Sequence, residues 1–170
     1  YSAKASDRDH RQYDYVLILN SYNESAPWSN SITSPIMHKI SELKDIDAYI
    51  EHLNLFMVND SVMVDRFPQM LLNKYGKTPP KLLVLLGSMS MIFREEIKEM
   101  WGDVSILVCD SDPYIYTEEY YRKQDVTTPE NKIHVDSLRD DYNITFMHTP
   151  AYLKESVKLM TRMIPVSYTH

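Results

Sequence analysis

Three short polar segments, each directly after an apolar run, carry the residue types best suited to chemistry. They are Asn20-Ser21-Tyr22-Asn23, Gly87-Ser88 and Asp110-Ser111-Asp112. Their amides, hydroxyls and carboxylates can hold a small polar ligand through hydrogen bonds. Tyr22 and Trp28 add aromatic rings against which such a ligand can stack. The same serine and asparagine side chains can instead close turns and cap helices.

The Gly87-Ser88 segment also opens a predicted helix that continues to Trp101. Ser88 and Ser90 then lie at the N-terminus of that helix, where free N–H groups and the helix dipole favour an anion or a carbonyl group. We therefore interpret residues Ser21, Tyr22, Asn23, Trp28, Gly87, Ser88 and Asp110 as a ligand-binding set, with Asn20 and Ser90 beside them.

The apolar runs predict five strands, at residues 15–20, 46–55, 81–86, 105–109 and 143–148. Strands that alternate with helices form parallel sheets covered on both faces. The first and third runs are strongly apolar and the second alternates, so we expect a three-layer αβα sandwich with strand order 2-1-3-4-5. In such a flavodoxin-like sheet, ligands bind beyond the carboxyl ends of the strands at the switch point, here between the first and third strands.

The helices are predicted from apolar residues at helical spacing. In the first helix, Ser29 or Asn30 is a candidate N-cap, and Pro35 is expected to delay or kink the helix. Its inward residues are expected to be Ile32, Ile36, Ile40 and Leu43. A second helix is expected from Asp60 or Ser61 to Lys74, weakened by Pro68, with Val62, Phe67, Met70 and Leu71 inward. A last helix is expected over residues 150–163.

Residues 110–140 form a long, tyrosine-rich segment with a short helix expected over residues 117–122. Tyrosines exposed on a long loop are typical of protein interfaces. Tyr114, Tyr116, Tyr120 and Tyr121 are therefore candidate interface residues, although they can also pack back onto the sheet. We expect residues 1–12 to form a flexible arm, residues 13–165 a single α/β domain, and residues 166–170 a truncated tail.

Several function classes lack their sequence requirements. The chain has three glycines, so neither a Walker A loop nor a GxGxxG turn can be written, and Gly87-Ser88-Met89-Ser90 is not a nucleophile elbow. A formal charge of −6 with no Lys/Arg run argues against nucleic-acid binding. The histidines lack metal-ligand spacing, and Asp110 with Asp112 is more typical of a solvated turn, so we expect neither a metal nor a cofactor. Cys109 ends an apolar run and is interpreted as an inert core residue.

Two other proteins of the same architecture are excluded by their site residues. A receiver domain needs acidic residues after the first strand and a phosphoacceptor aspartate after the third, where this chain has Asn20-Ser21 and Leu86-Gly87. A flavodoxin needs a Ser/Thr/Gly-rich phosphate loop after the first strand, whereas this chain has bulky residues and Glu24 there. The longest apolar runs have five to six residues, and a membrane span needs about 20. The chain begins at Tyr1, and we expect it to be an excised or processed segment.

Several segments resemble the extracytoplasmic sensor region of hybrid two-component histidine kinases from gut Bacteroidetes, which is similar to type I periplasmic binding proteins. They are VLILNSYNESAPWSNSITSPI, KLLVLLGSMS, SILVCD and the late Tyr142-Asn143-Ile144-Thr145 with Met163-Ile164-Pro165. The resemblance covers residues 13–165 and corresponds to the first of two lobes that flank a cleft. It implies Ser21, Tyr22, Trp28, Gly87, Ser88 and Asp110 as ligand residues.

The resemblance further implies a periplasmic sensor lobe without enzymatic activity of its own. Its parent would be a membrane-anchored, dimeric kinase, and its partner an unidentified small polar ligand or a periplasmic protein. A solute-binding lobe of a transport system is the alternative. An enzyme on a flavodoxin-like scaffold is a third possibility, but the sequence offers it no acid–base pair and no nucleophile.

Overall fold

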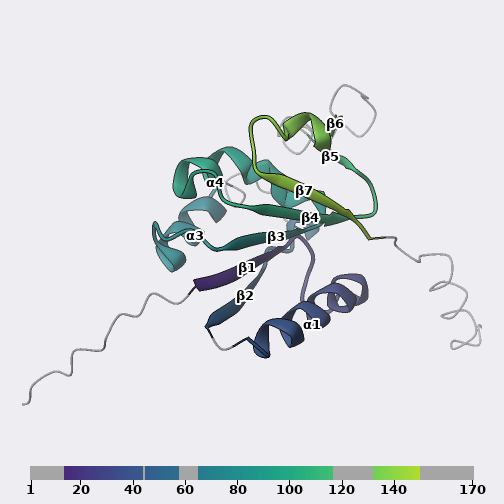
Figure 1. Ribbon diagram of the computed structural model, residues 1–170. Coiled ribbons are helices and arrows are strands. Elements are labelled where there is room, and N and C mark those ends of the chain that lie inside the picture. Colours follow the sequence, from purple (N-terminus) through teal and green to yellow (C-terminus); the bar gives the residue numbers. More distant parts are fainter. Residues whose placement is uncertain (1–13, 44, 58–64, 117–131, 150–170) are drawn as a thin grey trace, which may run out of the picture.

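The computed structural model describes residues 14–43, 45–57, 65–116 and 132–149. Its main feature is a five-stranded sheet in the order β2-β1-β3-β4-β7, in which every pairing is parallel (Figure 1). The strands are β1 (Asp14–Asn20), β2 (Ile46–His52), β3 (Leu82–Leu86), β4 (Ile106–Asp110) and β7 (Ile144–His148). Since β7 is the fifth strand of this sheet along the chain, the predicted order 2-1-3-4-5 is confirmed.

Strands β1 and β3 form the centre of the sheet because their side chains are apolar on both faces. Leu17 pairs with Leu83 and Leu19 with Leu85, and all four are fully buried. Strand β2 alternates between half-buried and exposed residues, as an edge strand with one solvated face should. The five predicted strands are therefore confirmed, except that the second, predicted over residues 46–55, ends at His52 and is followed by a 3₁₀ turn.

One face of the sheet is covered by α1 (Pro27–Ser41), which we call the α1 face (Figure 1). Ile32, Ile36 and Ile40 pack there on a cluster that includes Val16 and Ile18. Leu43, predicted to point inward, is 47% exposed. The helix ends at Ser41, so helical spacing no longer places Leu43 on the inward face.

The start of α1 also differs from the prediction. Its N-cap is Ala26, not Ser29 or Asn30, because Pro27 begins the helix. Proline has a helical φ and needs no hydrogen bond at the first helical position. Pro35 lies inside the helix, which continues through it to Ser41.

The opposite face carries the larger core and is covered by α3 (Phe67–Tyr75) and α4 (Arg94–Trp101) (Figure 1). Leu71 and Ile97 are completely or almost completely buried there. Met70, predicted inward, is 39% exposed because Phe67 and Leu71 occupy the inward row of this short helix. Pro68 lies in its first turn, where proline costs no hydrogen bond. The predicted start of this helix, with Asp60, Ser61 and Val62, lies outside the described residues.

Two segments have local structure that differs from the prediction. Gly87 is followed by a 3₁₀ helix, η2 (Ser88–Phe93), before α4, instead of one continuous α-helix. In the long tyrosine-rich segment, β5 (Tyr114–Tyr116) pairs antiparallel with β6 (Lys132–His134), and a 3₁₀ turn, η4 (Val135–Leu138), follows. Another 3₁₀ turn, η1 (Leu55–Met57), follows β2.

The helices expected over residues 117–122 and 150–163, the arm over residues 1–12 and the tail over residues 166–170 lie outside the described residues. Within the described ranges, none of the helices has the length and apolar character needed to cross a membrane.

Candidate functional site

The carboxyl ends of β1, β3 and β4 stay tied together by backbone hydrogen bonds beyond the last paired residues. Ser21 N donates to Leu86 O at 2.9 Å, and Gly87 N donates to Cys109 O at 2.9 Å. The loop that leads from β1 into α1 and the turn that leads from β3 into η2 are therefore neighbours. The predicted meeting of residues 20–28 with Gly87-Ser88 is observed, and we use the name switch-point crevice for this junction of the two segments.

Gly87 makes the close approach of these two segments possible. Its φ is +81°, and a Cβ atom built on it would lie 2.9 Å from Tyr22 Cε2 and 3.2 Å from Ser21 Cβ. A side chain here would be strained by its backbone conformation and would also collide with the β1–α1 loop. The scarcity of glycine in this chain is the sequence signal for this position.

Ser21 and Ser90 join the two segments of the switch-point crevice by hydrogen bonds. Both side chains are completely buried. Each hydroxyl donates to the Gly87 carbonyl, Ser21 at 3.2 Å and Ser90 at 3.1 Å, and Ser21 Oγ accepts from Ser90 N at 3.2 Å. Ser21 is thus used inside the protein, where it joins β1 to the β3–η2 turn.

Asn20 organises the entry to α1 in the same way. This buried amide accepts a hydrogen bond from Tyr22 N at 3.0 Å and donates to Ser29 Oγ at 3.2 Å. Its Nδ2 atom also lies 3.0 Å from Nδ1 of His52 at the end of β2. The contributions of Ser29 and His52 were not predicted, because both come from spatial neighbours that no local spacing reveals.

Asp110, at the end of β4, also contacts the β3–η2 turn. Its carboxylate accepts Ser88 N at 2.5 Å and Ser111 N at 2.6 Å. The expectation that free N–H groups here favour an anion is therefore wrong for Ser88 and Ser90. Asp110 already supplies the anion at Ser88, Ser21 Oγ occupies the Ser90 N–H, and η2 is a six-residue 3₁₀ helix with no long dipole behind it.

Two aromatic rings, those of Tyr22 and Trp28, lie in the β1–α1 loop and the first turn of α1. The Tyr22 and Trp28 rings meet edge to face, with centroids 5.2 Å apart. Trp28 is half-buried and packs on the α1-face core, so part of its ring is structural. Asn23 is exposed, and its Oδ1 accepts from Ser25 N at 3.0 Å and Ser25 Oγ at 2.9 Å, which shapes the loop.

Alkaline titration tests the placement of Tyr22. Burial, and then the nearby Asp110 carboxylate, raise the Tyr22 pKa from 10.0 to about 12. Because folding favours the neutral phenol, this contribution to stability is complete below pH 10 and is lost as the pH rises towards 12. We expect Tyr22→Phe to flatten the loss of stability over this range, measured by urea unfolding at several pH values. An unchanged slope in this variant would contradict the placement.

The predicted interface tyrosines are only partly described. Tyr114 on β5 is 40% exposed, and its ring meets His134 of β6 edge to face at 5.2 Å. Tyr116 ends the same strand. Tyr120 and Tyr121 lie outside the described residues. Tyr114 therefore combines packing on its partner strand with an exposed surface, and a role in association stays a prediction.

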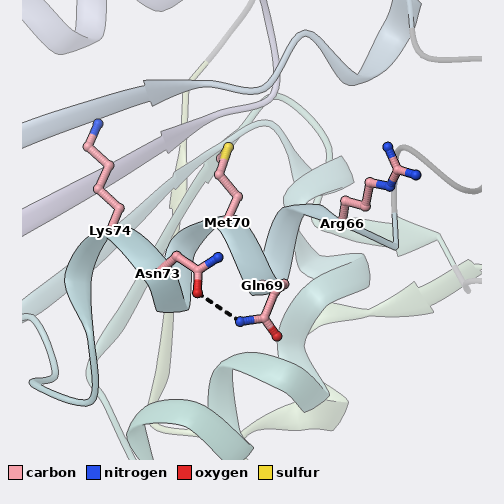
Figure 2. Close-up of a pocket in the computed structure, with 5 residues that line it drawn as sticks. All are labelled: Arg66, Gln69, Met70, Asn73 and Lys74. Atoms are coloured by element: carbon pink, nitrogen blue, oxygen red, sulfur yellow. Dashed lines mark hydrogen bonds between the residues drawn. The ribbon is translucent and has the colours of Figure 1, made fainter.

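A separate hollow of about 480 Å³ lies on the outer face of α3 (Figure 2). It is lined by Arg66, Gln69, Met70, Asn73 and Lys74. Figure 2 shows Gln69 joined to Asn73 by a hydrogen bond of 3.0 Å, and Lys74 pairs with Glu51 of β2. Because Gln69, Asn73 and Lys74 already have partners, we assign no ligand to this hollow.

The structure also bears on two other kinds of chemistry, metal binding and catalysis by the Cys109 thiol. Among residues 14–43, 45–57, 65–116 and 132–149, no group of three or more His, Cys, Asp or Glu side chains could hold a metal ion. Cys109 is fully buried in β4, and burial, followed by the Asp110 carboxylate, raises its thiol pKa to about 11. A thiol with so high a pKa is a poor nucleophile near neutral pH.

Comparisons with protein-family models, with curated proteins and with solved structures found no match to this chain.

Proposed function

We propose that this chain is the extracytoplasmic ligand-sensing lobe of a hybrid two-component sensor histidine kinase. The observation that carries the proposal is the switch-point crevice, where the β1–α1 loop and the β3–η2 turn meet at the carboxyl edge of a parallel sheet. This is the position at which open α/β sheets bind ligands. The sequence resemblance supplies the sensor class and the periplasmic location.

The chemistry of the crevice favours recognition over catalysis. The hydroxyls of Ser21 and Ser90 donate to the Gly87 carbonyl, so the proton of each hydroxyl is engaged in a structural hydrogen bond. A serine nucleophile instead donates to a base that removes its proton. The aromatic pair Tyr22 and Trp28, together with Asp110, offers surfaces for binding and orientation.

Signalling would follow from a shift in population. A ligand that binds one arrangement of lobes or protomers more tightly than another favours that arrangement by its differential affinity. In the parent receptor, which we propose is a membrane-anchored homodimer, this bias would reach the cytoplasmic kinase and start the phosphorelay. The exposed Tyr114 is a candidate part of the dimer surface.

A receptor experiment tests the proposed function. In cells that carry the parent protein, Trp28→Ala is expected to abolish the signalling response to the activating ligand, because the ring proposed to stack against that ligand is lost. Lys77→Ala provides the control, since Lys77 is exposed beyond the end of α3 and outside the crevice. Thermal unfolding of both variants checks that each one folds.

The sequence of the parent gene tests the proposed function independently of the receptor experiment. A membrane span and a kinase domain encoded after residue 170 agree with the proposal. A parent that ends in a second binding lobe, without a kinase, would replace it by a solute-binding protein of a transport system. A normal response of the Trp28→Ala receptor would show that the crevice is not the sensing site.

A further inference from the structure

Helix α1 covers only part of the α1 face. It lies beside β2, whereas β4 and β7 form the other end of the sheet (Figure 1). Of the described helices, only α1 contributes apolar residues to the core on this face. Parallel sheets are normally covered by helices on both faces. The part of the α1 face over β4 and β7 therefore lacks a covering helix among the described residues.

Side-chain exposure differs between the two faces of β4 and β7. On the α3–α4 side, Val108 of β4 is completely buried. On the α1 face, Leu107 is only half-buried, although β4 is an interior strand of the sheet. Met147 shares this face because it pairs with Cys109, and it is 38% exposed. We call this surface, formed by Leu107, Thr145 and Met147, the open face.

The segment that follows β7 has the residue pattern of a helix that could cover the open face. Leu153, Val157 and Met160 recur at helical spacing and form one apolar stripe. The charged residues fall on the opposite side of the same helix, and they are Lys154, Glu155, Lys158 and Arg162. A helix with one apolar and one charged side packs on a core and exposes its other side to water.

The described end of the chain is suited to start this helix. Thr149 is half-buried, and its Oγ1 atom is buried without a hydrogen-bond partner among the described residues. Threonine is a favoured N-cap, whose oxygen accepts a backbone N–H two or three residues later, and proline is favoured directly after the cap. This chain has Pro150 at that position.

The length of the segment also agrees with docking on the sheet. A helix over residues 150–163 would be about 21 Å long. This is enough to run back along β7, since a strand of five residues spans about 17 Å. The opposite face of the sheet is already covered by α3 and α4, so the open face is the place left for a helix that returns from β7.

We propose that residues 150–163 form an amphipathic helix that docks on the open face beside α1, with Leu153, Val157 and Met160 towards β4 and β7. The chain's own segment is the occupant because it leaves the sheet at the end of β7 and carries a matching apolar stripe. This docking goes beyond the proposed sensing function and does not depend on it.

NMR of the 170-residue chain with labelled methyl groups tests the docking directly. We expect nuclear Overhauser effects between the Leu107 and Met147 methyl groups and those of Leu153, Val157 or Met160. A mixture of labelled and unlabelled chains shows whether these contacts arise within one chain. Contacts found only between chains would place a second copy on the open face and overturn the proposal, and so would the absence of any such contact.

Matched double variants of the same chain test the orientation of the helix. Leu153→Gln with Met160→Gln places two amides on the apolar side and should lower the urea midpoint, because buried amides lose their hydrogen bonds to water. Lys154→Gln with Arg162→Gln makes the same kind of change on the charged side and should leave the midpoint nearly unchanged. Glutamine is a good helix former in both variants.

The outcomes of the two measurements complement each other. Equal urea midpoints in the two double variants would overturn the proposed orientation of the helix. If the variant with Leu153→Gln and Met160→Gln does not fold while the other does, the result agrees with docking of the apolar side. The methyl contacts of the unsubstituted chain then still decide between its own segment and a second copy.

Discussion

Replacement of Gly87 by alanine is expected to lower the free energy of unfolding by about 3–5 kcal/mol. Part of this loss comes from the backbone, because a φ of +81° is strained for any residue with a Cβ atom. The rest comes from the added Cβ, which would lie 2.9 Å from Tyr22 Cε2 and 3.2 Å from Ser21 Cβ. Urea unfolding followed by circular dichroism measures the loss.

The other two glycines of the chain isolate the contact from the backbone strain. Gly76 and Gly102 have φ values of +65° and +69°, and an added Cβ at either would have no atom within 4 Å. Gly76→Ala and Gly102→Ala should therefore lose only the backbone part, about 1–3 kcal/mol. A loss at Gly87 no larger than at these two positions would argue against the close contact between the crevice segments.

In the Gly87→Ala variant, the Tyr22 ring can move away from the added Cβ, which would reduce the loss of stability. Titration of the tyrosines separates this movement from the case in which the two segments are not in contact. A ring pushed towards solvent would lose the burial that raises its pKa to about 12. Spectrophotometric titration of the Gly87→Ala variant would then show an additional tyrosine that ionises closer to pH 10. A titration curve that matches that of the unsubstituted chain, together with a small loss of stability, would show that the two segments do not touch.

The order of the main sheet could be predicted because it follows from the chemistry of single strands. Runs such as Leu82–Leu86 are apolar on both faces, and only a central parallel strand buries both faces. Alternation in Ile46–His52 placed β2 at an edge. The predicted switch point between β1 and β3 followed from these two facts, and the Gly87–Tyr22 contact agrees with it.

The partners inside the crevice could not be predicted in the same way. The hydrogen bond from Ser88 N to Asp110 joins residues 22 positions apart, and the contact between Asn20 and His52 spans 32 positions. Such contacts depend on side-chain geometry after the strands have paired. The prediction of free N–H donors at Ser88 and Ser90 was wrong for this reason, since their acceptors come from β4 and from the β1–α1 loop.

The two shortest strands were not predicted, because three residues are too few to show a hydrophobic pattern. Strands β5 and β6 have three residues each, too few for alternation to separate them from a loop. Ile115 of β5 pairs with Ile133 of β6, is 1% exposed and belongs to the core on the α3–α4 side, against which Ile133 also packs. The long tyrosine-rich segment is thus anchored to the core at both of its described ends.

The second large loss of stability is expected when Leu71, in the core on the α3–α4 side, is replaced by alanine. This side chain is completely buried between α3 and the sheet. Leu71→Ala is expected to lower the free energy of unfolding by about 2–5 kcal/mol, because the methyl groups are lost and the surrounding core closes only in part. The change is measured as a shift in the urea midpoint at an unchanged denaturant slope.

Met70 is a matched control because it precedes Leu71 in the same helix and also becomes alanine. It is 39% exposed, so Met70→Ala should change stability by less than about 1 kcal/mol. Both substitutions improve helix propensity slightly, and the difference between them therefore measures burial. Equal losses at the two positions would mean that α3 is rotated about its axis, with Met70 inward as its helical spacing alone had suggested.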